Sequence, residues 1–191
     1  MSIYIQHDRF YSNGDKKITI QSFHKNTIPL NNLSQLDKLE HLTIKNDNTH
    51  ELCQEAQYEG ELKLPPNLLS LELYIDNLLN PTIIFNNKLE KLTIYEQHNT
   101  HIDYLNDRCA ECNKNKPDFK DKLINIFLSN HNYMLQTYPL SLKSINLYYN
   151  WKPYQLEEFE FLTLLKNKIT PHLPYGCSLS IEKIKDYKII H

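Results

Sequence analysis

The sequence predicts an α/β repeat fold, in which short strands recur along the chain and stack side by side in a curved parallel sheet. Three observations predict it. The chain has 191 residues, which suits one domain or one short repeat array. Its residues are 40% hydrophobic and 23% charged, the balance of a globular protein. A nine-residue pattern of apolar and polar positions also recurs five times, as in proteins built from stacked repeats.

The pattern runs apolar, two variable, apolar, one variable, apolar, two variable, polar. Its second and third apolar residues, two positions apart, would point to the inner face of a short strand, and the first would pack beneath them. The polar ninth residue would turn the chain and hydrogen-bond to neighbouring copies. The copies are Leu39-Leu42-Ile44 with Asp47, Leu68-Leu71-Leu73 with Asp76, Leu89-Leu92-Ile94 with Gln97, Leu123-Ile126-Leu128 with His131, and Leu142-Ile145-Leu147 with Asn150.

The spacing of the copies is that of a leucine-rich repeat, whose period is about 20–29 residues, with one longer interval that implies an insertion. The sequence therefore predicts one leucine-rich-repeat solenoid domain over residues 1–191, with its repeats at 28–150. Weaker copies at Ile18–Ile20 and Leu179–Ile181 lack the polar ninth residue. The alternative is an ordinary α/β domain whose strands are rich in leucine.

Two stretches give a closer resemblance. Residues 64–73 (LPPNLLSLEL) and 138–147 (YPLSLKSINL) resemble the FNIP-type repeat, whose coils begin Leu-Pro-x-Ser-Leu-x-x-Leu-x-Leu. Phe85-Asn86-Asn87 lies near the place where that family carries Phe-Asn. The resemblance implies a leucine-rich-repeat architecture and a source among amoebae or the giant viruses that infect them.

The N-terminal segment predicts a cap, because the ends of a repeat array expose apolar edges. Residues 2–11 alternate, with Ile3 and Ile5 on one face. Asn13-Gly14 then precedes a second alternating run, and Asn-Gly between two such runs is a strong hairpin signal. We therefore expect a capping hairpin over residues 2–21.

Residues 154–168 predict a C-terminal capping helix. Apolar residues recur there at every third position and would form one stripe. Acidic residues lie early in the segment and lysines late, which suits the helix dipole. The alternative, a membrane-binding helix, is disfavoured because its polar face would be basic rather than acidic. The stripe consists of Leu156, Phe159, Leu162 and Leu165.

The insertion at 96–122 carries the only chemical constellation in the sequence. His98 and His101 are followed by Cys109 and Cys112, each pair with two residues between its members. Zinc prefers four tetrahedral ligands from imidazole and thiolate groups, so the four side chains predict one closed, structural zinc site. One alternative is a solvated loop with an incidental cysteine pair. The other is a redox-active cysteine pair, which is disfavoured because such pairs occur next to a βαβ unit and the sequence shows none here.

A candidate binding surface follows from the strand pattern. Residues between the buried ones would point to the concave face of the solenoid, where three tyrosines would form one column and Phe127 would be an exposed apolar anchor. Tyrosine is enriched in interface hot spots, although it also favours strands for structural reasons. The predicted partner-binding residues are His41, Lys45, Glu72, Tyr74, Lys91, Tyr95, Phe127, Asn146 and Tyr148.

Enzymatic chemistry has little support in the sequence. Gly14, Gly60 and Gly176 are too far apart for a Gly-rich phosphate-binding loop. Neither the Gly-x-Ser-x-Gly elbow of serine hydrolases nor the His-Glu-x-x-His of zinc proteases occurs. We therefore expect no enzymatic activity and no cofactor other than one structural zinc.

The overall composition narrows the class of partner. A net charge of −2 argues against nucleic acid, and no apolar run approaches the roughly 20 residues of a membrane span. No secretory signal is visible, and four cysteines suit a reducing compartment, the cytoplasm or a host cytoplasm. The sequence predicts a monomeric protein–protein interaction module that binds on its concave face. The alternative is a zinc-stabilised structural protein whose insertion loop is the binding surface.

Overall fold

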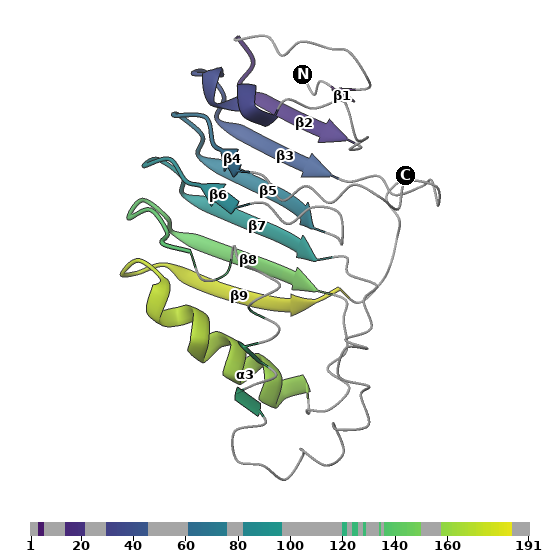
Figure 1. Cartoon of the computed structure of the whole chain (residues 1–191), viewed down its shortest axis with the longest axis vertical. Coiled ribbons are helices and arrows are strands. Elements are labelled where there is room, and N and C mark those ends of the chain that lie inside the picture. Colours follow the sequence, from purple (N-terminus) through teal and green to yellow (C-terminus); the bar gives the residue numbers. More distant parts are fainter. Residues whose placement is uncertain are drawn as a thin grey trace.

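The computed structural model describes residues 4–5, 14–21, 30–45, 61–75, 82–96, 120–121, 124–125, 128, 134, 136–149 and 158–184. Their main feature is a seven-stranded sheet in which every neighbouring pair is parallel (Figure 1). The predicted parallel sheet is therefore confirmed. In sheet order its strands are β1 (Tyr4–Ile5), β2 (Lys17–Gln21), β3 (His41–Lys45), β5 (Ser70–Ile75), β7 (Lys91–Glu96), β8 (Ser144–Tyr149) and β9 (Ser178–Lys183).

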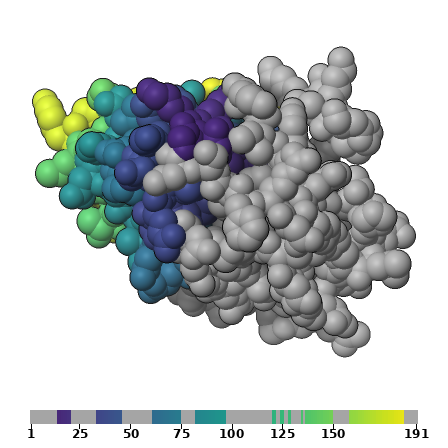
Figure 2. Space-filling model, turned by 90° about the horizontal axis from the view of Figure 1, so that it is seen from above, coloured from purple at the N-terminus to yellow at the C-terminus, as the bar shows by residue number. Residues whose placement is uncertain are grey.

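A second, smaller layer lies behind this sheet. Strands β4 (Glu61–Lys63) and β6 (Thr82–Ile84) pair in parallel. The helical elements are η1 (Leu30–Gln35), α3 (Glu158–Ile169) and η4 (Thr170–His172). Figure 2 views the main sheet from the end where β2 lies, so the purple and blue residues of the first strands stand in front of the teal, green and yellow residues of the later ones. Chain order and spatial order thus agree along the sheet.

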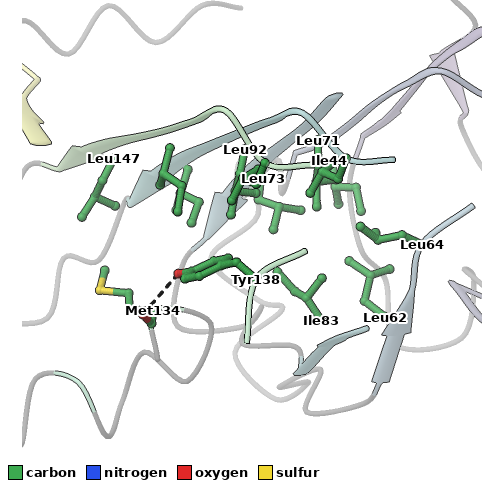
Figure 3. Packing of buried hydrophobic residues seen from close by; sticks show 14 of the residues in the cluster. Ile44, Leu62, Leu64, Leu71, Leu73, Ile83, Leu92, Met134, Tyr138 and Leu147 are labelled. Atoms are coloured by element: carbon green, nitrogen blue, oxygen red, sulfur yellow. Dashed lines mark hydrogen bonds between the residues drawn. The ribbon is translucent and has the colours of Figure 1, made fainter. Parts of the chain in front are cut away.

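The core lies between the two layers. Two apolar residues of each main strand from β2 to β9 point inward and align across the sheet, as the register Leu71↔Leu92 and Leu73↔Ile94 shows. They pack against Leu62 of β4 and Ile83 of β6 (Figure 3). Leu62, Leu71 and Leu73 are fully buried, and burying each such side chain contributes about 1.5–3 kcal/mol. The predicted i, i+2 apolar pattern therefore forms the core face of the sheet.

The entries of β3, β5, β7 and β8 are fastened to the preceding coil in a repeated way. Two successive N–H groups donate to one carbonyl oxygen of that coil, at N···O distances of 2.8–3.2 Å. The donor pairs and their acceptors are Glu40 and His41 to Lys16, Leu69 and Ser70 to Glu40, Glu90 and Lys91 to Leu69, and Lys143 and Ser144 to Glu90.

Side chains in the turns before the strands add a second set of coil-to-coil bonds, which we call the turn ladder. Its members are Asn67, Asn86 and Ser141. Asn67 donates to the Asp37 carbonyl, Asn86 to those of Pro65 and Leu68, and Ser141 to that of Leu89. The polar ladder expected from the sequence concerned the other end of the strands. Its five positions, Asp47, Asp76, Gln97, His131 and Asn150, lie outside the described residues.

The predicted strand at 123–128 is wrong. Ile124, Asn125 and Leu128 are helical, and β7 pairs directly with β8, so no strand lies between them. Ile124 and Leu128 are both buried, and residues four apart lie on one face of a helix. Leu128, an apolar residue of the predicted copy, therefore lies in a helix together with Ile124. The chain between β7 and β8 is longer than the insertion expected at 96–122.

The predicted N-terminal hairpin is also wrong. Strands β1 and β2 are parallel, with Tyr4 opposite Thr19 and Ile5 opposite Ile20, whereas a hairpin needs antiparallel strands. The Asn-Gly signal therefore does not join the two strands in a tight turn. The weak copy at Ile18–Ile20 is instead an ordinary strand of the main sheet.

The C-terminal helix is confirmed, but its buried stripe differs from the expected one. The buried residues of α3 are Phe161, Leu165 and Ile169, four apart, while Phe159 is 83% exposed. Four-residue spacing follows the helix pitch better than the expected three-residue spacing. The helix also does not end the fold, because β9 follows it and pairs with β8. It forms the crossover that two adjacent parallel strands require.

Candidate functional site: the outer face of the sheet

The outer face is the side of the main sheet that points away from the core. Its side chains form three columns that run across the strands. The first column holds Lys17, His41, Ser70, Lys91, Ser144 and Ser178, and the middle column Thr19, Thr43, Glu72, Thr93, Asn146 and Ser180. The third column continues from Lys45 through Tyr74, Tyr95 and Tyr148 to Glu182.

No described element covers this face. The second layer, helix α3 and the helical residues before β8 all contribute side chains to the single core cluster on the other side of the sheet. Leu62, Ile83 and Phe161 are examples, and the first two are visible in Figure 3. Within the described part of the chain, the outer face is therefore the broad surface of the sheet that is left without a packing partner.

Three tyrosines stack on this face and form what we call the tyrosine ladder, Tyr74, Tyr95 and Tyr148. The ring centroids of Tyr74 and Tyr95 are 4.4 Å apart, and those of Tyr95 and Tyr148 are 4.9 Å apart, with interplanar angles of 14° and 13°. These distances match the spacing of neighbouring strands, about 4.7–4.9 Å, so the register itself brings the rings face to face. The ammonium of Lys45 lies 4.7 Å from the centroid of Tyr74 and covers its remaining face.

Glu72 orients the hydroxyl of Tyr74. The hydroxyl of Tyr74 donates a hydrogen bond of 2.9 Å to the Glu72 carboxylate. Burial raises the pKa of Tyr74, and the neighbouring Glu72 carboxylate raises it further. Burial is also the main cause of the raised pKa of Tyr95, followed by Glu72. Both phenols therefore keep their protons to a higher pH than a tyrosine in an unfolded chain does.

The first column is basic. Lys17, His41 and Lys91 are exposed along it, and the lysines form no ion pair with another described residue. One residue earlier in the chain the arrangement differs, because Lys16 pairs with Glu40 and Lys143 with Glu90, each at 2.8 Å. Among the described residues, the Lys16–Glu40 and Lys143–Glu90 ion pairs thus lie at the rim of the sheet, whereas Lys17 and Lys91 of the outer face are outside any ion pair.

The structure brings together most of the residues proposed from the sequence for partner binding. His41, Lys45, Glu72, Tyr74, Lys91, Tyr95, Asn146 and Tyr148 all lie on the outer face. Phe127 lies outside the described residues, and the strand that was to carry it is absent from the sheet. Lys17 and Glu182 belong to the same face and were missed. The weak copies at β2 and β9 were the signal that could have found them.

The proposed zinc ligands His98, His101, Cys109 and Cys112 lie outside the described residues, so the zinc site stays a prediction. Among the residues that are described, no three His, Cys, Asp or Glu side chains come together as metal ligands would. Within the described residues, no helix is long and apolar enough to cross a membrane.

Comparison with known proteins gives no match. No family model, no curated protein and no solved structure matches the chain.

Proposed function

We propose that the protein is a non-enzymatic leucine-rich-repeat solenoid that binds a partner protein on the outer, concave face of its sheet. The observation that carries the proposal is the tyrosine ladder on a sheet face that no described element covers. A ladder of this kind is a large, ordered and amphipathic surface, and such surfaces are typical of protein interfaces.

The solenoid part of the proposal rests on the repetition of one coil. Strand entries bond to the preceding coil by the same pair of N–H groups from β3 to β8. The two stretches that resemble the FNIP-type repeat also begin alike, because the Leu68 N–H donates to the Pro65 carbonyl and the Leu142 N–H to the Pro139 carbonyl. Repeated local contacts between neighbouring units are the defining property of a solenoid.

The binding part rests on the order of the ladder. Each ring is held by its neighbours, so little rotamer freedom is left to lose when a partner binds. A purely structural ladder would also stack, since aromatic cross-strand pairs stabilise sheets. The two roles differ in their consequences for a ligand, and an experiment with ladder variants separates them.

The test is selection of peptides from a random library displayed on phage against the immobilised protein. Each enriched peptide is then measured against the variant Tyr74→Thr/Tyr95→Thr/Tyr148→Thr, with folding checked by circular dichroism. Threonine keeps the strand propensity. The matched control is Tyr175→Thr, which removes a fully exposed tyrosine from the turn before β9.

We expect enriched peptides that bind the wild type and Tyr175→Thr equally and lose binding to the ladder variant. Peptides that bind all three proteins equally would move the binding surface elsewhere on the molecule. Failure to enrich any peptide over several rounds would contradict the interaction function itself.

A second candidate function is a zinc-stabilised structural protein whose insertion loop is the binding surface. The pattern of His98, His101, Cys109 and Cys112 favours it. One zinc per chain, measured by elemental analysis, and its loss in Cys109→Ser/Cys112→Ser would support it. Zinc content that is unchanged in this variant would rule out the four-ligand site.

A further inference from the structure

The tyrosine ladder limits the chemistry of its ligand, because both ring faces of Tyr74 and of Tyr95 are already occupied. Tyr95 is sandwiched between its two neighbours, and Tyr74 lies between Tyr95 and the Lys45 ammonium. Proline rings, sugars and nucleobases bind aromatic side chains mainly by stacking on their faces. What the ladder can still offer is its ring edges and its hydroxyls other than that of Tyr74, which already donates to Glu72. Aromatic edges carry partial positive charge and phenols donate hydrogen bonds, so both attract oxygen acceptors.

The net charge of the outer face also favours ligands that carry negatively charged or acceptor oxygen atoms. Its described charged residues, apart from His41, are three lysines, Lys17, Lys45 and Lys91, and two glutamates, Glu72 and Glu182, which gives +1 against −2 for the whole chain. The glutamates also differ in position. Glu72 is engaged by the Tyr74 hydroxyl, and Glu182 lies on the last strand. The part of the face over β2 to β7 is therefore a positive surface on an acidic protein, which steers anionic partners toward it.

The first column, with its lysines, and the third column, with its tyrosines, are close enough for one extended peptide to contact both. Positions in the first and third columns are four residues apart along each strand, which is about 13 Å at 3.3 Å per residue. The middle column between them holds the short side chains Thr19, Thr43 and Thr93, and also Glu72, whose carboxylate accepts the hydrogen bond from Tyr74. One extended segment that runs across the strands over this middle column can therefore reach the lysines on one side and the ladder on the other.

We propose that the outer face binds an acidic, extended peptide segment of its partner. Carboxylates of the segment lie along Lys17, His41 and Lys91, and its carbonyl groups face the edges and hydroxyls of the tyrosine ladder. The inference rests on the proposed interaction function and names the class of partner. A nucleic acid is the weaker candidate, because the ring faces of Tyr74 and Tyr95 are unavailable for base stacking.

The test uses defined probes in fluorescence anisotropy. The probes are a fluorescein-labelled decapeptide of alternating Glu and Thr, the same peptide with Lys in place of Glu, and a ten-nucleotide oligo(dT). The informative variant is Lys17→Glu/Lys91→Glu. The matched control is Lys63→Glu/Lys166→Glu, which makes the same charge change on the exposed side chains of β4 and α3. Circular dichroism verifies that both variants fold.

We expect the wild type and the control to bind the Glu-Thr peptide alike, and the Lys17→Glu/Lys91→Glu variant to bind it roughly tenfold or more weakly. We also expect binding to weaken as salt is added. Equal weakening by both variants, preference for the Lys-Thr peptide or oligo(dT), or no binding of the Glu-Thr peptide at low salt would each overturn the inference. If phage selection meanwhile yields neutral or basic peptides that need the ladder, the interaction function stands and only the acidic class falls.

Discussion

Tyr95 is the central ring of the tyrosine ladder, with Tyr74 stacked on one face and Tyr148 on the other. The sequence predicts that these tyrosines share a column, because each follows the last inward apolar residue of its strand. It does not predict that they stack. Stacking of Tyr95 on Tyr148 depends on the register of β7 with β8. That register cannot be predicted from the sequence, because a long chain segment connects the two strands. The cation–π contact of Lys45 and the bond from Tyr74 to Glu72 depend on side-chain conformations that no sequence pattern specifies.

The ladder should stabilise the fold most at its centre. Tyr95→Thr removes two stacked pairs and should lower the free energy of unfolding by about 1–3 kcal/mol, since each aromatic pair contributes about 0.5–1.5 kcal/mol beyond its buried area. Tyr148→Thr removes one described pair and should cost roughly half as much. Urea unfolding measures both, with the exposed Tyr175→Thr as the control. Equal losses in the free energy of unfolding for Tyr95→Thr, Tyr148→Thr and Tyr175→Thr would contradict an energetic role for stacking.

Alkaline pH should destabilise the protein through its buried phenols. Burial is the main cause of the raised pKa values of Tyr74, Tyr95, Tyr138 and Tyr149. A tyrosine in the unfolded chain has a pKa of about 10. Below that pH both states hold their protons and the stabilisation is fully present. Above it the unfolded state ionises first, so the free energy of unfolding falls as pH rises through the folded-state pKa values.

Urea unfolding at a series of pH values from roughly 8 to 12 measures this loss. The variants Tyr138→Phe and Tyr149→Phe should each flatten the dependence on pH, because phenylalanine does not ionise. Phenolate absorbance of the folded protein should also lag behind that of the urea-unfolded chain. Superimposable titrations of the two states would show that the phenols are not held protonated by the fold.

At the scale of elements, strands with a fully alternating pattern are the ones that the sequence predicts well. β3, β5, β7 and β8 all lie within predicted copies. The short strands β4 and β6 were missed, because three residues carry too little alternation to be recognised. The false strand at 123–128 has the opposite cause, since its apolar spacing also fits a helix. Short apolar patterns cannot separate these cases without knowledge of the packing partner.

Within the turn ladder, the side-chain amide of Asn86 should make the largest contribution to stability. The Asn86 side chain accepts hydrogen bonds of 2.8 Å from the Lys88 and Leu89 N–H groups and donates to the Leu68 carbonyl at 3.1 Å. Asn86→Ala should lower the free energy of unfolding by about 1–3 kcal/mol, because it leaves partly buried backbone groups without their partners.

The neighbouring residue supplies the control. Asn87 is exposed, so Asn87→Ala should change the free energy of unfolding by less than about 0.5 kcal/mol. Asn86→Asp keeps the acceptor and loses the donor, and it should fall between the two. Urea unfolding of all three variants gives the comparison. A cost for Asn86→Ala no larger than that for Asn87→Ala would show that the turn ladder follows the fold rather than supporting it.

At the scale of the whole molecule, stability in a solenoid comes from contacts between neighbouring coils. A central strand such as β5 is bonded to a coil on each side, whereas β9 is bonded in the sheet to β8 alone. An ordinary α/β domain has one cooperative core, and its central elements exchange together. The two architectures therefore predict different patterns of local opening, and native-state hydrogen exchange can read them strand by strand.

We expect exchange protection to be highest in β5 and β7 and to fall toward β9, because opening an end coil breaks one interface and opening a central coil breaks two. Leu73→Ala, at a fully buried position of β5, should cost about 2–5 kcal/mol and reduce protection in both flanking strands. Leu179→Ala, at a partly buried position of β9, should cost less and leave β5 protected. Uniform protection that collapses together in both variants would contradict the solenoid and favour a single cooperative α/β core.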